Sequence, residues 1–78
     1  MNQAIIFNDD LCYDETHKAW CFTGMMSGQC ITIYFHSFSL GRLKEIDSCT
    51  KFDLEEIAEL WLEKNEPEED EIHITMKD

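Results

Sequence analysis

Apolar and polar side chains alternate most regularly between residues 19 and 36, where two β-type runs flank Ser27-Gly28. If these two residues form the loop of a hairpin, counting outward from the loop sets Trp20 opposite Phe35. Because side chains alternate across a strand, the pattern predicts a core face of large apolar residues: Trp20, Phe22, Ile31, Ile33 and Phe35. The other side of the hairpin, here called the second face, would carry Cys21, Thr23, Met25, Cys30, Thr32, Tyr34 and His36. This mixed surface would be open to water or covered by a second subunit.

Two more strands are predicted near the ends of the chain. Residues 4–7 are a short apolar run, followed by turn-forming residues at 8–10. Residues 72–76 alternate apolar side chains with His73 and Thr75, which is typical of a half-buried strand. Residues 11–18 mix charged and isolated apolar positions, so we expect a connection or turn there.

The spacing becomes helical after His36. Ser37 or Ser39 can cap a short first helix, in which apolar residues recur at three-residue steps: Leu40, Leu43 and Ile46. Gly41 weakens this helix, which should have only about two turns. Residues 47–49 are then expected to be a loop.

A second, longer helix is predicted to begin with a capping box at Thr50 and Asp53 and to end at Asn65 and Pro67. Its apolar face consists of Leu54, Ile57, Ala58 and Trp61, with Leu62 at the edge. Its opposite face consists of Glu55, Glu56, Glu59 and Glu63. Glutamates at successive four-residue steps form a ridge of like charge, which mildly destabilises the helix. An acidic connection at residues 66–71 follows.

These elements predict one α+β domain over residues 1–78. We expect two layers: a mainly antiparallel sheet with two helices on one face, in the order β-β-β-α-α-β. A chain of 78 residues buries only a small core, so dimerisation is a plausible supplement to its stability.

Several segments resemble a known family. They are the opening Met-Asn-Gln-Ala-Ile-Ile-Phe, the Phe22-Thr23 strand with Gly28 after it, the helix start at residues 52–56, and Ile72-His73-Ile74 with the terminal Asp78. Over nearly the whole chain they look like the small bacterial family filed as domain of unknown function 1488, also called Shew3726-like. The resemblance implies a two-layer α+β fold and supplies no catalytic residues, because the function of the family is unknown. The chain departs from the family pattern at residues 42–50, where the first helix looks short.

Charge and hydropathy exclude several classes of partner. The formal net charge is −11, from 17 acidic and 6 basic side chains. Direct binding to nucleic acid is not expected, because affinity for phosphate backbones comes from Lys and Arg. No apolar run approaches the ~20 residues that span a bilayer, and residues 1–7 lack the features of a secretory signal. We therefore expect a cytoplasmic protein without membrane association.

The cysteines and histidines form no recognisable site in the sequence. The four cysteines lack a C-x-x-C pair, and reduced thiols are the expected state. A metal cluster of Cys21 and His36 with His17 or His73 is a conceivable alternative. Sequence motifs for nucleophilic catalysis, phosphate binding or zinc proteases are absent. We therefore predict no enzyme activity, no cofactor and no metal ligands.

The best remaining hypothesis is a non-catalytic protein-interaction module that acts as a homodimer. The predicted interface residues are Met25, Tyr34 and His36 on the second face and Glu55, Glu59 and Glu63 on the helix ridge. Tyr34 is taken as an exposed aromatic residue that seeds a flat subunit interface. The ridge suits a basic protein partner, and with residues 66–71 it could mimic DNA phosphates and block a DNA-binding protein. A solvated acidic face and a thiol or metal-binding protein are the remaining alternatives.

Overall fold

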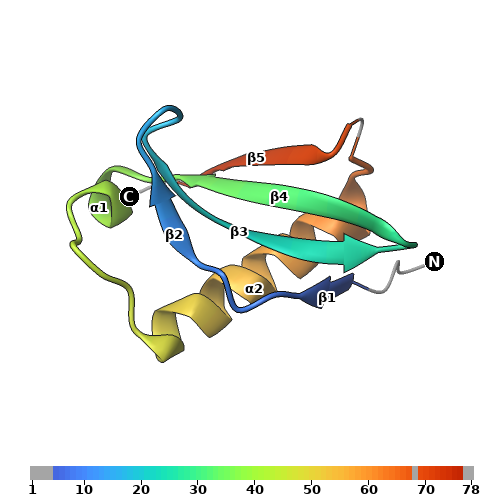
Figure 1. Cartoon of the computed structure of the whole chain (residues 1–78), viewed down its shortest axis with the longest axis horizontal. Helices are drawn as coiled ribbons and strands as arrows, with labels where there is room; N and C mark the ends of the chain where they lie inside the picture. The colour runs from blue at the N-terminus through green and yellow to red at the C-terminus, as the bar shows by residue number, and fades with distance from the viewer. Residues whose placement is uncertain (1–4, 68, 77–78) are drawn as a thin grey trace.

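Seven elements follow one another in the computed structural model, which describes residues 5–67 and 69–76 (Figure 1). They are β1 (Ile5–Phe7), β2 (Cys12–Asp14), β3 (Ala19–Met26), β4 (Gln29–His36), α1 (Phe38–Gly41), α2 (Ser48–Lys64) and β5 (Glu71–Thr75). The strands form one sheet in the order β1-β3-β4-β5, with β2 paired to β3 beside β1. Only β4 and β5 pair in parallel among these strands. The predicted α+β fold with a mainly antiparallel sheet is confirmed.

The central hairpin of β3 and β4 has the predicted register, from Trp20 opposite Phe35 to Met26 opposite Gln29. Ser27 and Gly28 form its turn with φ angles of 55° and 79°. Positive φ at both positions matches the twist of the flanking strands and suits glycine, which has no Cβ. The five predicted core-face residues of the hairpin are all buried. Apolar alternation and a two-residue turn were therefore sufficient to fix the centre of the sheet.

Helix α2 crosses the core face of the sheet (Figure 1) and buries Leu54, Ala58 and Leu62 there. It begins at Ser48, two residues before the predicted start. The side chain of Asp47 accepts a hydrogen bond of 2.8 Å from the backbone N–H of Thr50. This bond holds the pKa of Asp47 below its usual value. The predicted cap at Thr50 is wrong, and the predicted loop at 47–49 is correct only for Asp47, because Ser48 and Cys49 belong to the first turn of α2. The Asp47 side chain, and not that of Thr50, accepts from a free N–H of this turn.

Helix α1 is also shorter than predicted. Ser37 caps it, and only Leu40 is buried, while Leu43 lies beyond the helix and is exposed. The indole N–H of Trp20 donates to the Leu40 carbonyl at 2.8 Å, which ties this single turn to β3. The helix ends at Gly41, with Arg42 as its C-cap, instead of continuing to Ile46.

The segment predicted as a connection contains the additional strand β2, which pairs with β3 over three residues. Asn8 and Asp10 fill the gap between β1 and β2: both bond to Thr23, Asn8 through its backbone N–H at 2.8 Å and Asp10 through its carboxylate.

Residue 4 of the predicted first strand and residue 68 of the acidic connection lie outside the described residues. β5 confirms the predicted final strand, with Ile72 and Ile74 buried. Within residues 5–67 and 69–76, no helix is both long and apolar enough to cross a membrane.

Candidate functional site

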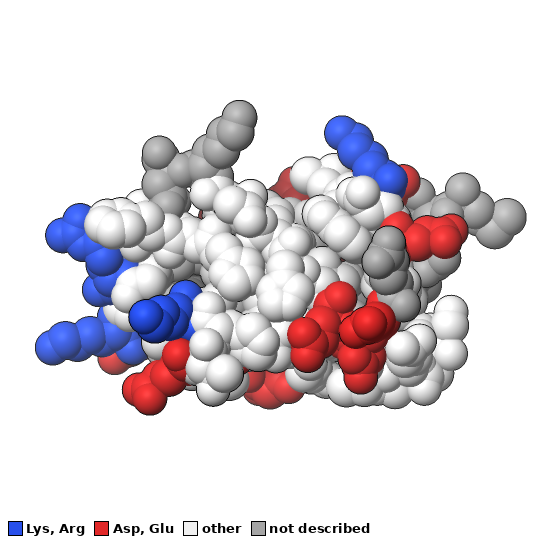
Figure 2. Space-filling view, turned by 90° about the horizontal axis from the view of Figure 1, so that it is seen from above, with Lys and Arg blue, Asp and Glu red and all other residues white. Residues whose placement is uncertain are grey.

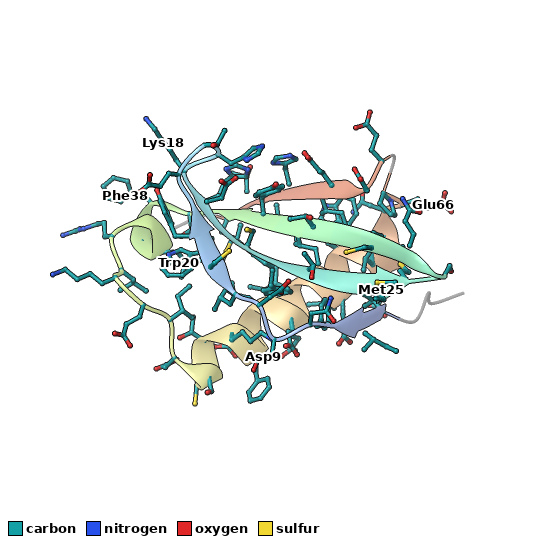
Figure 3. The ribbon with its side chains drawn as sticks, viewed as in Figure 1. Asp9, Lys18, Trp20, Met25, Phe38 and Glu66 are labelled. Atoms are coloured by element: carbon teal, nitrogen blue, oxygen red, sulfur yellow. The ribbon has the colours of Figure 1, made fainter. Side chains whose placement is uncertain are left out.

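The second face carries a row of side chains that crosses four strands. Cys12 lies opposite Cys21, Cys21 opposite Tyr34, and Tyr34 opposite His73. The row lies toward the β2–β3 turn, because Cys12 and Cys21 are paired on the two strands that this turn joins; Lys18, in the turn, is labelled in Figure 3. The buried parts of α1 and α2 belong to the core on the opposite side of the sheet. The row therefore combines thiol, phenol and imidazole groups on a face that neither helix covers.

The β2–β3 turn places His17 over this row. Its conformation depends on Asp14, whose carboxylate accepts a 3.3 Å hydrogen bond from the backbone N–H of Thr16 and contacts Nδ1 of His17. Lys18 closes the turn with a φ of 54°. The His17 contact is the main cause that lowers the pKa of Asp14, so this carboxylate stays ionised and orients the ring. The His17 ring lies 4.2 Å from the Tyr34 ring, centroid to centroid.

β5 brings His73 to the other side of Tyr34. The two rings are stacked at 4.8 Å with an interplanar angle of 13°. Nδ1 of His73 lies 2.9 Å from Nε2 of His36, and Nε2 of His73 lies 3.3 Å from a carboxylate oxygen of Glu71. Burial is the main cause that lowers the pKa of His36, and His73 and His17 add to it. A neutral His36 can accept a hydrogen bond from His73 Nδ1 or donate one to it, depending on the tautomer.

Three potential metal ligands converge at this point. One ligand atom from each of His17, Glu71 and His73 lies within 4.8 Å of the others. Nδ1 of His17 is engaged by Asp14, so its free nitrogen is Nε2. Two imidazoles and a carboxylate are a donor set that divalent transition metals, and zinc in particular, accept. This cluster, here called the histidine cluster, is the candidate site.

The predicted interface residues do not come together at one place. Tyr34 is only 8% exposed beneath the His17 and His73 rings, so it is not the exposed aromatic residue that was predicted. Met25 is 39% exposed, but it lies toward the hairpin tip, away from the β2–β3 turn (Figure 3). Of this group only His36 joins the histidine cluster.

The predicted glutamate ridge is interrupted. Glu55 is half-buried and accepts a 2.5 Å hydrogen bond from the Lys51 ammonium, which also donates to the Asn8 carbonyl. Its charge is therefore neutralised at the sheet side of α2, where a cation four residues earlier reaches it. Glu59 and Glu63 are exposed on α2 and form no part of the histidine cluster.

Of the residues named in the metal alternative, the three histidines come together and Cys21 does not join them. His17, His36 and His73 gather as one cluster, whereas Cys21 contacts Cys12. Sequence reasoning missed Glu71, Asp14 and Cys12. The alternation at residues 71–75 was a usable signal, since it places Glu71 and His73 on one side of β5.

Comparison with known proteins identifies a structural relative. No family model matches the chain, and no curated protein matches it. A solved structure does: a protein of unknown function from Shewanella loihica PV-4, assigned to the domain of unknown function 1488 family. The two chains are 29% identical, the match covers 95% of this chain and 94% of the other, and the TM-score is 0.66. This match confirms the resemblance noted in the sequence.

Proposed function

We propose that this chain, a relative of the domain of unknown function 1488 family, binds a divalent transition-metal ion, with zinc as the best-suited metal. The observation that carries the proposal is the convergence of His17, Glu71 and His73 to within 4.8 Å on the second face. Each imidazole also has its other nitrogen occupied, by Asp14 for His17 and by His36 for His73. Metal-bound histidines in proteins are typically oriented by such outer partners.

The distances suit a tetrahedral ion. Nitrogen and oxygen ligands lie ~2.0–2.2 Å from zinc, which puts tetrahedral ligand atoms about 3.3 Å apart. The Glu71 oxygen and His73 Nε2 already have this separation, at 3.3 Å. The His17 ligand atom lies within 4.8 Å of the other two, so its side chain would have to rotate toward them to complete the site. Three protein ligands leave a fourth position for water.

Metal binding requires a change of tautomer at His73. Nε2 of His73 donates its proton to Glu71 in the absence of metal, and then Nδ1 accepts from His36. A metal ion on Nε2 would release that proton to the solvent, the proton of His36 Nε2 would pass to His73 Nδ1 across the 2.9 Å contact, and His36 would take up a proton from the solvent at its Nδ1. The pair of histidines can therefore adapt to the ion without moving the backbone. The cluster stands on an open face, and nothing in the described residues points to catalysis, so we propose binding and not a reaction.

The test is a zinc titration of the full chain, followed by calorimetry and by the ring-nitrogen NMR signals of the three histidines. We expect one ion per chain, with the largest shift at Nε2 of His17 and His73. Glu71→Gln should weaken binding by about tenfold or more, because a neutral amide is a poor zinc ligand. Glu69→Gln is the matched control, since it makes the same change at an exposed residue next to the site. Absence of saturable binding, or equal losses in the two variants, would reject the proposal.

A second function, protein binding, is favoured by the outer face of α2. Phe52 is 64% exposed and Leu60 is 52% exposed, although both are large and apolar. Exposed glutamates surround them on the same side of the helix: Glu56, Glu59 and Glu63. On the face that Figure 2 shows, several Lys and Arg side chains gather at the end of the molecule near α1. We propose that this outer helix face binds a basic protein surface with apolar contacts, while dimerisation and DNA mimicry are competing outcomes.

A crosslinked pull-down at ~50 and ~200 mM salt distinguishes these outcomes, because screening weakens contacts between exposed charges. We expect a basic protein to be enriched at low salt and to be lost at higher salt. It should also be lost, at low salt, when the bait is the double variant Phe52→Ser/Leu60→Ser. Leu43→Ser is the control, since Leu43 is exposed outside α2. Competition by added DNA would favour mimicry. Recovery of only the protein's own copies, or binding indifferent to salt and to Phe52→Ser/Leu60→Ser, would refute the basic-partner proposal.

A further inference from the structure

We propose that Cys12 and Cys21 form a thiol–disulfide exchange site, which reacts with a small disulfide and closes into an intramolecular disulfide between β2 and β3. This inference is separate from metal binding, because neither sulfur is among the three ligands of the histidine cluster. It assigns a role to the two thiols of the row, neither of which belongs to the proposed metal site.

The geometry of the pair carries the inference. The two cysteines are direct partners in the antiparallel pairing of β2 and β3, and their sulfur atoms are 3.9 Å apart. Opposed residues on antiparallel strands have Cα atoms ~4.5–5.5 Å apart, within the ~4.4–6.8 Å that a disulfide spans. Rotation of the two side chains therefore brings the sulfurs to bonding distance while the strands stay in place.

The two thiols differ in a way that sets the order of reaction. Cys12 is exposed, whereas Cys21 is 8% exposed in a small cluster with Ala19 and Tyr34. Burial is the main cause that raises the pKa of Cys21 to about 12, and the hydrogen bond and charge of Cys12 add to it. Cys21 therefore keeps its proton, and Cys12 is the sulfur that a dissolved disulfide reaches first.

The exchange takes two balanced steps. The Cys12 thiolate attacks a small disulfide R–S–S–R, so that a Cys12–S–S–R bond forms and one thiolate RS⁻ leaves. Cys21 then loses its proton to the solvent or to RS⁻, and its sulfur attacks the Cys12 sulfur and expels the second RS⁻. The two protein thiols are oxidised, the small disulfide is reduced to two thiols, and no other oxidant is needed. Modification of Cys12 also removes the hydrogen bond and the charge that raised the pKa of Cys21.

The remaining cysteines provide internal controls. Cys30 pairs with Met25 at the hairpin tip, and Cys49 lies in the first turn of α2. Both are exposed, and neither has a sulfur contact with another cysteine among the described residues. They should form stable mixed disulfides with a small disulfide, because no second thiol is in place to release it.

The experiment treats the folded full chain with oxidised glutathione and follows it by intact mass and peptide mapping. In a Cys30→Ser/Cys49→Ser background we expect the loss of two hydrogens, a Cys12–Cys21 bond and no retained glutathione. Cys21→Ser in that background should trap one glutathione on Cys12, and Cys12→Ser should react at least about tenfold more slowly, as expected for a buried thiol.

Two controls exclude misfolding as the cause of these results. Each variant must have the far-UV circular dichroism spectrum of the native protein, and the unmutated chain is analysed by peptide mapping as well. In the unmutated chain we expect glutathione on Cys30 and Cys49 and a bond between Cys12 and Cys21. Stable glutathione on Cys12 in the presence of Cys21 would overturn the proposal. So would faster reaction at Cys21 than at Cys12. Neither result bears on the zinc titration, so the two proposals stand or fall separately.

Discussion

Phe35→Ala is expected to lower the free energy of unfolding by about 3–5 kcal/mol, the usual cost of removing a buried phenylalanine. Phe35 is 0% exposed on β4, which lies between β3 and β5 in the sheet. Its ring packs 5.2 Å from the ring of Phe22, centroid to centroid, in the core that α2 covers. The neighbouring strands are hydrogen-bonded to β4 on both sides, so they cannot collapse into the cavity.

That loss is large for so small a domain, since ~0.05–0.15 kcal/mol per residue gives a total stability of only about 4–12 kcal/mol for 78 residues. Urea unfolding followed by tryptophan fluorescence measures it. Phe52→Ala is the matched control, because the same atoms are removed from a ring that is 64% exposed; it should change stability by no more than about 0.5 kcal/mol. Similar losses in the two variants would contradict the assignment of the core.

The parts of the fold that were predictable from the sequence are those set by local patterns. The register of β3 and β4 follows from alternation and a two-residue turn, and the end of α2 follows from Asn65. β2 was missed because three residues are too short for a pattern, and because the bonds that hold the preceding residue Asp10 to Thr23 of β3 are not local in sequence. The start of α2 was predicted too late in the chain because Asp47 and Thr50 are both suitable N-cap residues. The sequence does not show which of the two side chains accepts the hydrogen bond from the first turn.

The histidine cluster was not predictable for a related reason. His17, His36 and His73 are far apart in the sequence, and they meet because β5 returns parallel to β4 with His73 opposite Tyr34. The register of a parallel pair is set by the crossover through α2 and not by a turn, so no local signal gives it. The same arrangement explains the error at Tyr34. A face without helices was expected to be open, but the β2–β3 turn and β5 each place an imidazole against its ring.

His17→Ala and Asp14→Asn are expected to weaken zinc binding to different degrees, if the histidine cluster is the metal site. Asp14→Asn keeps the ligand and removes the charge that orients it through Nδ1. Loss of such an outer partner typically costs ~10–100-fold in metal affinity. His17→Ala removes the nitrogen ligand itself, so its loss should exceed that of Asp14→Asn. The affinities can be compared by zinc titration at one pH and ionic strength.

The order of these losses separates a ligand from a residue that positions it. Asp14 also accepts the backbone N–H of Thr16, so circular dichroism must show that Asp14→Asn keeps the β2–β3 turn. Asp9→Asn is the matched control, since Asp9 is an exposed carboxylate outside the three-ligand cluster, and it should leave the affinity within about twofold because exposed charges are screened by salt. If Asp14→Asn and Asp9→Asn weaken zinc equally, the acidic surface attracts the ion nonspecifically. If Asp14→Asn weakens zinc binding and His17→Ala does not, the Asp14 carboxylate binds the metal directly and the proposed ligand set is wrong.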